Sequence, residues 1–293
     1  MHVTKLTATY YVVDEFLQNF MPYMEKHLLG SYRSKPTRIC SLNSSEIMTI
    51  ILMFHSARFR DFKAYYQHLA QFHTSEFPHL VSYNRFIALM PRVLVPLCFF
   101  TQSLPKTETG CYFMDATAIK VCHIKRAHAN KVFKELGTKS KTSTGWFFGL
   151  KLHLIVNDLG EIMNFQLTTG KVNDRFPVMD LCKKLIGKVF ADKGYLGKEL
   201  FEKLMDKGIQ VITKIRKNMK NVLMPLWDKL MLRKRSIIET IIDQLKNISQ
   251  IEHASHRSIP NFLVNLIAGI GAYQLKNKKP SLGKVYMTDL HYT

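Results

Sequence analysis

Two aspartates stand where they could share a metal ion. Each closes a short apolar run, in the segments Phe113–Asp115 and Phe190–Asp192. If these runs are neighbouring strands of an open α/β sheet, both carboxylates point into the crevice at the carboxyl ends of the strands, where ligands gather. Two like charges at that separation require a cation, and their hard oxygen atoms suit Mg²⁺ or Mn²⁺.

A third acidic residue, Glu239, falls within a predicted helix over residues 235–247. At about 100° per residue, four apolar side chains form one buried stripe: Ile238, Ile241, Ile242 and Leu245. Arg235, Glu239 and Lys246 lie within about 40° of one another at the edge of that stripe. This placement suits a metal-binding carboxylate flanked by cations that hold phosphate. An amphipathic helix with an Arg235–Glu239 ion pair explains the same spacing, and the helix alone favours this simpler explanation.

Other polar residues compete for places in such a site. Asp174 competes with Asp192, and we interpret it as a helix cap or as a support for the site rather than a ligand. Asp243 is a weaker competitor of Glu239, because it points farther from the buried stripe. His153 lies on the polar face of its strand and could touch the site, although a single histidine in a strand is more often structural or exposed.

The charge of the chain indicates a polyanionic partner. Lys and Arg number 42 against 22 Asp and Glu, which gives +20 and a pI near 9.7. Residues 120–151 and 207–235 together supply +15 of this surplus. Rows of such charges bind a phosphate backbone, so we expect nucleic-acid contacts from Lys125, Arg126 and Lys151. A ribosomal protein, a membrane-surface protein or a merely basic surface remains the simpler alternative.

Length and composition narrow the class of protein. The 293 residues suffice for one or two domains, and 46% hydrophobic with 22% charged residues is ordinary globular composition. Apolar stretches are too short or too interrupted for a membrane span, and no secretion signal is recognisable. The five scattered cysteines form no CxxC pair, which argues against a disulfide framework or a cysteine zinc site. We therefore expect a cytoplasmic protein.

The first part of the chain, residues 1–105, is predicted to be an all-α domain. Helices are expected over 47–55, where Asn43 and Glu46 form a reciprocal cap, over 60–71, and over 82–97 with Pro91 as a break. Asn84 and Arg85 would stand at the start of a recognition helix if these helices form a helix-turn-helix. A plain helical bundle is at least as consistent with the sequence. In a polar loop near the end, His256 and Arg257 could contact DNA or be solvated.

Residues 106–278 are predicted to form an α/β domain. Strands are expected over 111–115, 146–157, 161–167, 188–192 and 210–215, with 118–123 as a hairpin or continuation. Helices are expected over 175–186, capped by Asp174, and over 198–207, 235–247 and 261–276, and a basic loop over 125–144. Strands followed by β-α alternation predict a mixed sheet covered by helices. Residues 279–293 are expected to be a loosely ordered basic tail.

These residues resemble a known family. Asp115, Asp192 within Ala-Asp-Lys-Gly-Tyr, and Glu239 are similar to the DDE triad of bacterial insertion-sequence transposases, which have a ribonuclease-H-like catalytic core. The spacing Arg235-x3-Glu239-x6-Lys246 matches the pattern that such transposases carry around the glutamate. The family commonly places a tyrosine where this chain has Leu232, which puts a tyrosine contact to DNA in doubt but not the metal site. The resemblance covers roughly residues 108–276.

The resemblance implies a metal-dependent DNA transposase. Asp115 would bridge two Mg²⁺ or Mn²⁺ ions, and Asp192 and Glu239 would each complete one coordination sphere. Lys193, Arg235 and Lys246 would hold phosphates of double-stranded DNA, both the terminal repeats of the element and the target. A homodimer or larger assembly is expected. A nuclease or resolvase of the same fold, a catalytically inactive DNA-binding remnant, and a structural RNA binder are the alternatives.

Overall fold

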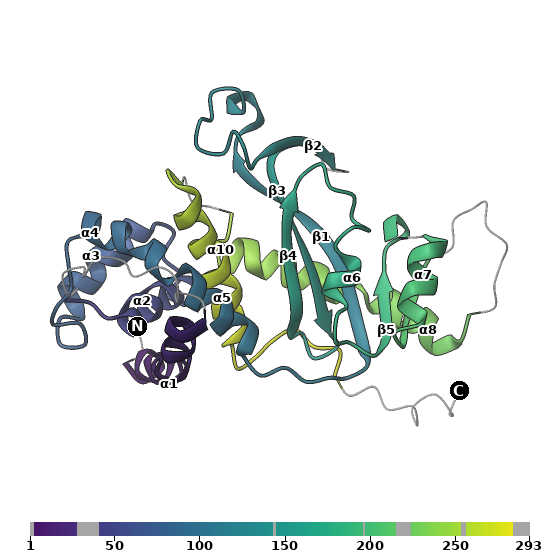
Figure 1. Cartoon of the computed structure of the whole chain (residues 1–293), viewed down its shortest axis with the longest axis horizontal. Coiled ribbons are helices and arrows are strands. Elements are labelled where there is room, and N and C mark those ends of the chain that lie inside the picture. Colours follow the sequence, from purple (N-terminus) through teal and green to yellow (C-terminus); the bar gives the residue numbers. More distant parts are fainter. Residues whose placement is uncertain are drawn as a thin grey trace. The chain divides into compact units, whose positions relative to one another are not determined.

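The computed structural model describes residues 3–27, 41–142, 145–195, 197–214, 224–252 and 256–283. The chain divides into two compact units (Figure 1). The helical unit combines residues 1–104 with 245–275, and the sheet unit combines 105–244 with 276–293. The sequence predicted one boundary near residue 105, so the segment 245–275 differs from that prediction by joining the helical unit.

Apolar helix faces build the core of the helical unit. Its described helices are α1 (Val3–His27), α2 (Ser44–Ser56), α3 (Phe62–Phe72), α4 (Tyr83–Leu89), the 3₁₀ helix η1 (Met90–Val93), α5 (Leu94–Ser103) and α10 (Ile259–Gln274). The predicted cap of α2 is confirmed, since Asn43 and Glu46 bond to each other's backbone N–H. Helix α10 packs against α2 and α5, and its Leu266, Ile270 and Tyr273 are buried.

The helix-turn-helix interpretation finds little support in these helices. The loop 73–82 between α3 and α4 is far longer than the turn of about three or four residues in that motif. The run Tyr83–Ser103 is apolar and long enough to cross a membrane by length and composition alone. However, Phe86, Leu97 and Phe100 within it are core residues, and this packing accounts for its apolar composition. The described helices therefore favour the plain bundle.

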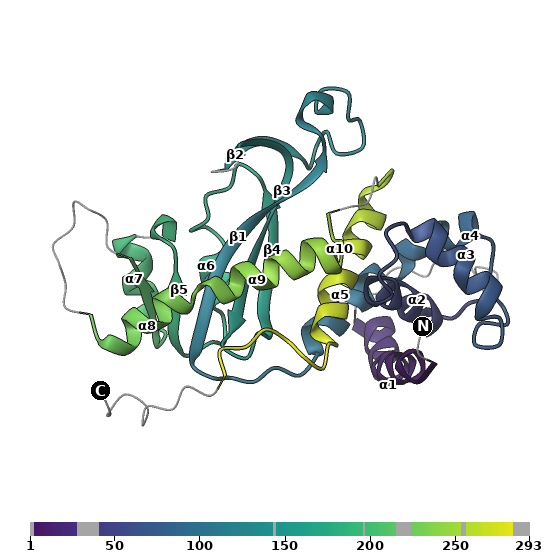
Figure 2. The same ribbon diagram turned by 180° about the vertical axis from the view of Figure 1, so that it is seen from behind.

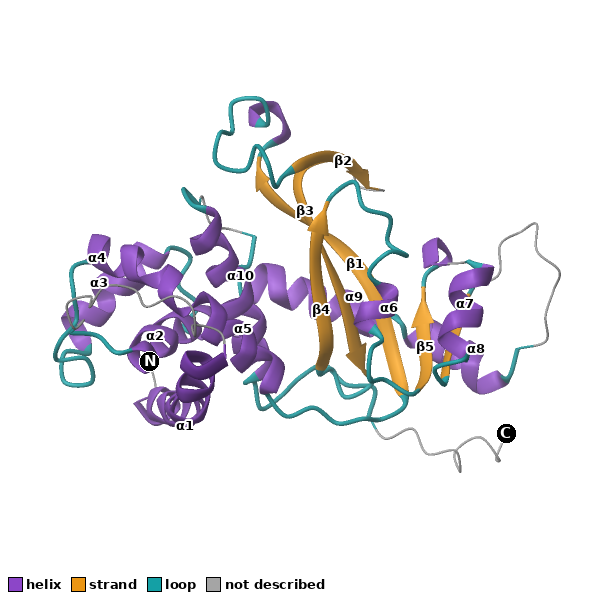
Figure 3. Cartoon of the chain, in the orientation of Figure 1, coloured by secondary structure: helices purple, strands orange, loops and turns teal. Residues whose placement is uncertain are grey.

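The sheet unit is built on a mixed sheet. Its strands are β1 (Cys111–Cys122), β2 (Thr138–Thr142), β3 (Gly145–Asn157), β4 (Ile162–Thr169), β5 (Gly187–Ala191) and β6 (Ile209–Thr213). The order is β2-β3-β1-β5-β6, and β4 also pairs with β3. Strand β3 is antiparallel to β1, β2 and β4, whereas β5 runs parallel to β1 and β6. The predicted mixed sheet flanked by helices is confirmed, and Figure 3 shows the strands gathered in this unit.

Helices cover both faces of the sheet. They are α6 (Val178–Leu181), α7 (Lys198–Met205), α8 (Leu226–Lys234) and α9 (Ser236–Asp243), with short turns η2 (Ile124–Arg126), η3 (Lys193–Tyr195) and the π-helical η4 (Gln244–Ile248). On one face, Met114 and Val189 pack with residues of α6. Helix α9 contacts β1 and α8 contacts β5 and β6, and Figure 2 shows both helices in front of the strands.

Several predicted elements differ from the structure. The helix predicted over 175–186 was wrong, because only α6 is helical and Lys184 adopts a left-handed backbone (φ 74°) that a helix cannot continue. Of the two alternatives for 118–123, a hairpin or a continuation, the structure shows the continuation, since β1 extends to Cys122. The predicted basic loop contains β2. In the tail, Leu282 N donates to Asp158 O at 2.9 Å. The rest of the tail, 284–293, and residues 215–223 of the second basic segment lie outside the described residues.

Candidate active site

Asp115 lies in β1, and Asp192 directly follows the parallel neighbouring strand β5. Strands β1 and β5 pair with Phe113 opposite Phe190, and each aspartate follows its phenylalanine by two residues. The two rings stack with their centroids 5.6 Å apart. Because side chains alternate along a strand, both aspartates belong to the face of the sheet that carries these rings.

Helix α9 supplies the third carboxylate from that same side. Ile237, Ile238 and Ile241 are buried and hold α9 against β1. Glu239 is exposed over 58% of its side chain, and Arg235 donates from Nη2 to its Oε1 at 3.0 Å. The i,i+4 ion pair considered from the sequence is therefore present.

Arg235 also reaches across to the sheet. Its Nη1 lies 3.4 Å from Asp115 Oδ2, so one guanidinium connects carboxylates of the helix and of β1. The Arg235 side chain is 18% exposed and the Asp115 side chain 25%, which strengthens their attraction relative to a surface pair. The ion pair predicted within the helix is thus also a contact between two elements of the candidate site.

The environment of Asp115 opposes its ionisation. Burial raises the pKa of its carboxyl, and the negative charges of Glu239 and Asp192 raise that pKa further. A hydrogen bond of 2.9 Å from Ala116 N and the charge of Arg235 act in the opposite direction. A carboxylate that feels two others at a half-buried site is stabilised as an anion by any added cation.

These oxygen atoms fit a hard divalent cation. Among the residues that the structure describes, no three histidine, cysteine, aspartate or glutamate side chains converge as a ready metal cage. The donor set is nevertheless all carboxylate, the type that Mg²⁺ and Mn²⁺ prefer, and a positive group already lies between two of its members. The acidic triad Asp115, Asp192 and Glu239 therefore suits such an ion chemically. In this structure the positive charge beside Asp115 and Glu239 is that of Arg235.

Tyr195 belongs to the same neighbourhood, and no role was predicted for it. It is 3% exposed, and its hydroxyl has no hydrogen-bond partner among the described residues. Burial raises its pKa well above the ordinary value, and the charges of Asp115 and Asp174 act in the same direction. The sequence signal that could have indicated its place near the site is the Ala-Asp-Lys-Gly-Tyr motif, in which Tyr195 follows Asp192 by three residues.

Asp174 forms an ion pair in the sheet unit and is not a helix cap, because α6 begins at Val178. Its Oδ1 accepts from Lys151 Nζ at 2.9 Å, while Lys151 also donates to Val172 O at 3.1 Å. Burial lowers the pKa of neighbouring His153 to about 4, so the ring is neutral near pH 7, and it bonds Thr168 Oγ1 at 2.8 Å. His153 is thus a structural residue of the sheet.

A basic hollow adjoins Asp174. This lysine recess has a volume of about 450 Å³ and is lined by four cations: Lys139, Lys141, Lys151 and Lys171. The first two come from β2, which the sequence did not predict, so only Lys151 was named in advance. Lys139 and Lys141 lie on the same face of β2 because side chains alternate along a strand. Lys151 lies on β3 and Lys171 follows β4, and both β2 and β4 pair with β3.

The remaining predicted residues lie elsewhere. Lys193 is exposed in η3, directly after Asp192. Lys246 belongs to the helical unit, where its Nζ lies 3.2 Å from Glu252 Oε2. Lys125 and Arg126 are exposed in the segment between β1 and β2 that projects beyond the sheet in Figure 1.

Asn84 and Arg85 are exposed in the first turn of α4, in the helical unit. Asp243, the weaker competitor, is exposed at the last position of α9. Leu232, at the family's tyrosine position, is buried in α8. The structure therefore places Arg235 against Asp115 and Glu239, and Lys193 directly after Asp192. The other predicted DNA contacts belong to other elements.

Comparison with known proteins identifies the family. No curated protein matches the chain. Among solved structures, the piggyBac transposase synaptic complex with hairpin DNA aligns with a TM-score of 0.48 and 9% identity, over 92% of this chain and 74% of that one. A family described as "Transposase DDE domain" matches residues 106–259, more than half of the chain and the part that carries the acidic triad. The chain therefore belongs to the DDE transposase domain family.

Proposed function

We propose that this protein is the DNA transposase of an insertion sequence, which cuts DNA at the ends of its element and joins the freed 3′-hydroxyl to target DNA. The observation that supports this most is that Asp115 in β1 lies within reach of the charges of Asp192, directly after β5, and of Glu239, to which Arg235 links it. It falls within the residues that match the transposase family.

The acidic triad would hold two Mg²⁺ or Mn²⁺ ions. Bound ions of this kind lower the pKa of an attacking water or hydroxyl and neutralise the leaving oxygen of a phosphodiester. Asp115, the most enclosed of the three carboxylates, suits the shared position. Arg235 would then turn from carboxylates towards a DNA phosphate, which its planar fork can bind through two hydrogen bonds.

Basic residues around the triad would hold the DNA. Lys193 is exposed directly beside Asp192, and the lysine recess adjoins Asp174 in the same unit. Rows of lysine side chains bind phosphates without reading sequence, which suits both element ends and varied targets. Two DNA ends must be joined in one reaction, so we expect a homodimer or larger assembly on double-stranded DNA.

The test uses DNA that carries the sequences flanking this gene, incubated with Mg²⁺ or Mn²⁺. Wild-type protein is compared with Asp192→Asn and with Asp206→Asn, a matched change at the exposed end of α7. Discrete cuts at terminal positions, lost only in Asp192→Asn, are expected. Random nicking would replace the proposal with a nuclease, and metal-dependent cutting that survives in Asp192→Asn would refute the triad. Binding without cutting by wild-type protein would indicate a DNA-binding remnant.

A further inference from the structure

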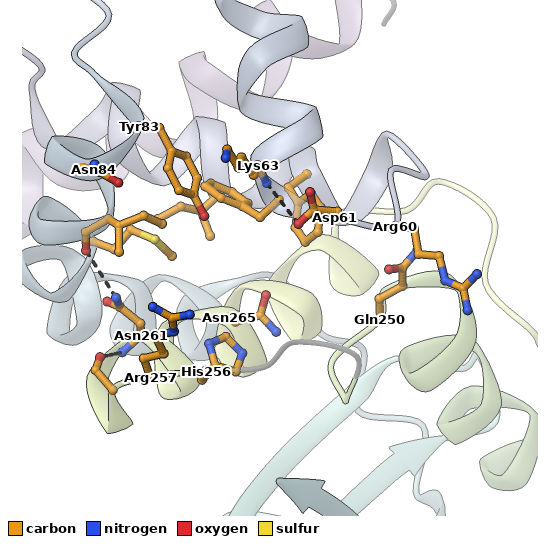
Figure 4. A pocket seen from close by; sticks show the side chains of 16 residues that line it. Arg60, Asp61, Lys63, Tyr83, Asn84, Gln250, His256, Arg257, Asn261 and Asn265 are labelled. Atoms are coloured by element: carbon orange, nitrogen blue, oxygen red, sulfur yellow. Dashed lines mark hydrogen bonds between the residues drawn. The ribbon is translucent and has the colours of Figure 1, made fainter. Parts of the chain in front are cut away.

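The helical unit contains a second polar pocket, separate from the acidic triad. It has a volume of about 770 Å³ and lies between the start of α3, the start of α4 and the first turns of α10 (Figure 4). Three residues that the sequence singled out line it: Asn84, His256 and Arg257. The sequence analysis did not connect Asn84 with the other two. Pockets of this size commonly enclose a small molecule or one unit of a polymer. We call it the amide pocket, after the side chains described next.

Four side chains of the amide pocket have buried polar atoms that find no hydrogen-bond partner among the described residues. These atoms are Gln250 Oε1, His256 Nε2, Asn261 Oδ1 and Asn265 Nδ2. Asn261 is fixed by its other end, because its Nδ2 donates to Ile87 O at 3.2 Å, as Figure 4 shows. Buried polar atoms are normally paired, so several together at one pocket indicate a ligand that pairs with them.

The protonation of the pocket histidine adds to this pattern. Burial lowers the pKa of His256 to about 4, so its ring is neutral near pH 7 and can donate or accept at Nε2. Gln250, whose Oε1 is one of the four unpaired atoms, adopts a left-handed backbone with φ 52°. This conformation costs energy for a residue other than glycine. The pocket thus presents neutral hydrogen-bond donors and acceptors, and one of them is held by a strained backbone at Gln250.

Three cations surround these neutral groups. Arg60, Lys63 and Arg257 line the pocket, are exposed, and have no ion pair within the part of the chain that the structure describes. Asp61, the carboxylate among the described residues that line the pocket, accepts hydrogen bonds from Lys63 N at 3.3 Å and Ala64 N at 3.1 Å as the cap of α3. The local surplus of positive charge suits an anionic group.

Aromatic and apolar side chains form the remaining wall. Phe62 and Tyr83 line the pocket, are partly exposed, and have ring centroids 6.4 Å apart. Figure 4 shows Tyr83 extending towards Arg257 and Asn261. Partly exposed rings of this kind are platforms on which a flat heterocycle stacks.

We propose that the amide pocket binds a single nucleotide unit, either an unpaired nucleotide of bound DNA or a free nucleotide. The cations hold its phosphate, Tyr83 or Phe62 stacks on the base, and the amides with His256 pair with the edge of the base. Phosphate alone would leave the four neutral polar atoms unpaired, and an apolar ligand would leave the cations unpaired. A nucleotide satisfies all three groups of side chains at once.

The test uses the full chain in the presence of a chelator, so that its outcome does not depend on the reaction proposed for the triad. One probe is a single-stranded oligonucleotide with one 5-iododeoxyuridine for photo-crosslinking, and the other is a set of free deoxynucleoside monophosphates followed by ligand-observed NMR. We expect crosslinks in peptides that contain Tyr83 or Phe62. If the oligonucleotide crosslinks and the monophosphates do not bind, the occupant is a nucleotide of bound DNA. If the monophosphates bind, the pocket accepts a free nucleotide.

Variants decide whether the pocket is responsible. Arg257→Gln and Tyr83→Leu should weaken binding about tenfold, the loss expected for one stacking or phosphate contact. Arg92→Gln removes an exposed cation of the same unit outside the pocket and should bind like wild type. Because Arg257 is exposed, its variant should fold, which circular dichroism checks. The proposal is overturned if neither probe binds the wild-type protein, or if Arg92→Gln weakens binding as much as Arg257→Gln.

Discussion

Arg235 lies 3.4 Å from Asp115, a residue that is 120 positions away in the sequence. The same guanidinium is bonded to Glu239 at 3.0 Å. An arginine side chain does not deprotonate near neutral pH, so its charge is permanent. Its charge therefore offsets part of the repulsion between these two carboxylates before any metal ion binds, and a metal ion must compete with it.

This competition predicts that Arg235→Gln binds divalent metal more tightly. Removing the guanidinium deletes one positive charge within the site and frees both carboxylates. We expect the dissociation constant for Mn²⁺, measured by isothermal titration calorimetry without DNA, to fall by up to about tenfold, which corresponds to about 1.4 kcal/mol. Arg233→Gln, an exposed change in α8, should leave it unchanged. Equal or weaker binding by Arg235→Gln would contradict a competing role.

The sheet and the places of the three acidic residues on their elements could be predicted because local patterns encode them. Asp115 and Asp192 follow apolar runs, and the stripe of Ile238 and Ile241 fixes which side of α9 is buried. Adjacent strands then place residues of equal register together. The position of Glu239 on its helix could therefore be predicted from the sequence. The contact of Arg235 with Asp115 on β1 could be seen only in the tertiary structure.

Other features depend on contacts that no local pattern records. Asp174 looked like a helix cap, but Lys151 binds its carboxylate, and the predicted helix shrinks to α6. Strand β2 was missed because its sequence is strongly basic and pairs at the edge of the sheet with β3. The amide pocket was missed because it combines α3 and α4 with the segment before α10, which is more than 150 residues later.

The lysine recess predicts a specific salt dependence. Each lysine that contacts a phosphate of duplex DNA contributes about 0.9 to the slope of log K against log salt concentration. Lys139→Gln and Lys171→Gln should each lower that slope by about this amount, whatever the DNA sequence. Fluorescence anisotropy at several salt concentrations measures it. Lys183→Gln removes an exposed charge outside the recess, and a similar loss there would show that the effect is general.

The ion pair between Lys188 on β5 and Asp228 on α8 predicts asymmetric losses of stability. Its 2.8 Å contact joins a carboxylate that is 4% exposed to a lysine that is 35% exposed. Lys188→Met leaves the buried carboxylate unpaired and should lower the free energy of unfolding by about 3 kcal/mol, whereas Asp228→Asn keeps a hydrogen bond and should cost about 1 kcal/mol. Urea denaturation compares them.

The exposed pair Lys203–Glu199 provides the control for that comparison. Both side chains are largely exposed, at 59% and 82%, although their contact is short at 2.7 Å. Surface pairs of this kind contribute little to stability. Lys203→Met should therefore leave the urea midpoint unchanged, and a loss equal to that of Lys188→Met would show that burial is not the cause.

His55 predicts that the protein loses stability in mild acid. Burial lowers its pKa to about 4, while its Nδ1 bonds to Ser249 O and the charge of His256 lowers the pKa further. The unfolded state, with a pKa near 6.5, binds a proton first as pH falls. The free energy of unfolding should therefore decrease from about pH 6.5 towards pH 4, by on the order of 2 kcal/mol for this group between pH 7 and 5.

Denaturant titrations of His55→Gln at the same pH values isolate this contribution. The variant lacks the buried titrating ring, so its stability should fall less steeply between pH 7 and 5 than that of wild type. His79→Gln removes an exposed histidine and should keep the wild-type slope. An unchanged slope in His55→Gln would assign the acid sensitivity to other groups.

Gly149 is the glycine that the pairing of β1 with β3 requires. A Cβ atom at this position would lie 2.0 Å from Ile119 O, closer than any real contact, and the clash is with backbone that cannot move aside. Gly149→Ala should therefore disrupt the strand that carries Asp115 and cost several kcal/mol, on the order of the largest single-site effects. Gly194→Ala is the matched control, because a Cβ there meets no atom within 4 Å. Thermal unfolding should show a large loss for the first variant and none for the second, and equal melting temperatures would mean that β1 and β3 do not approach each other as closely as described.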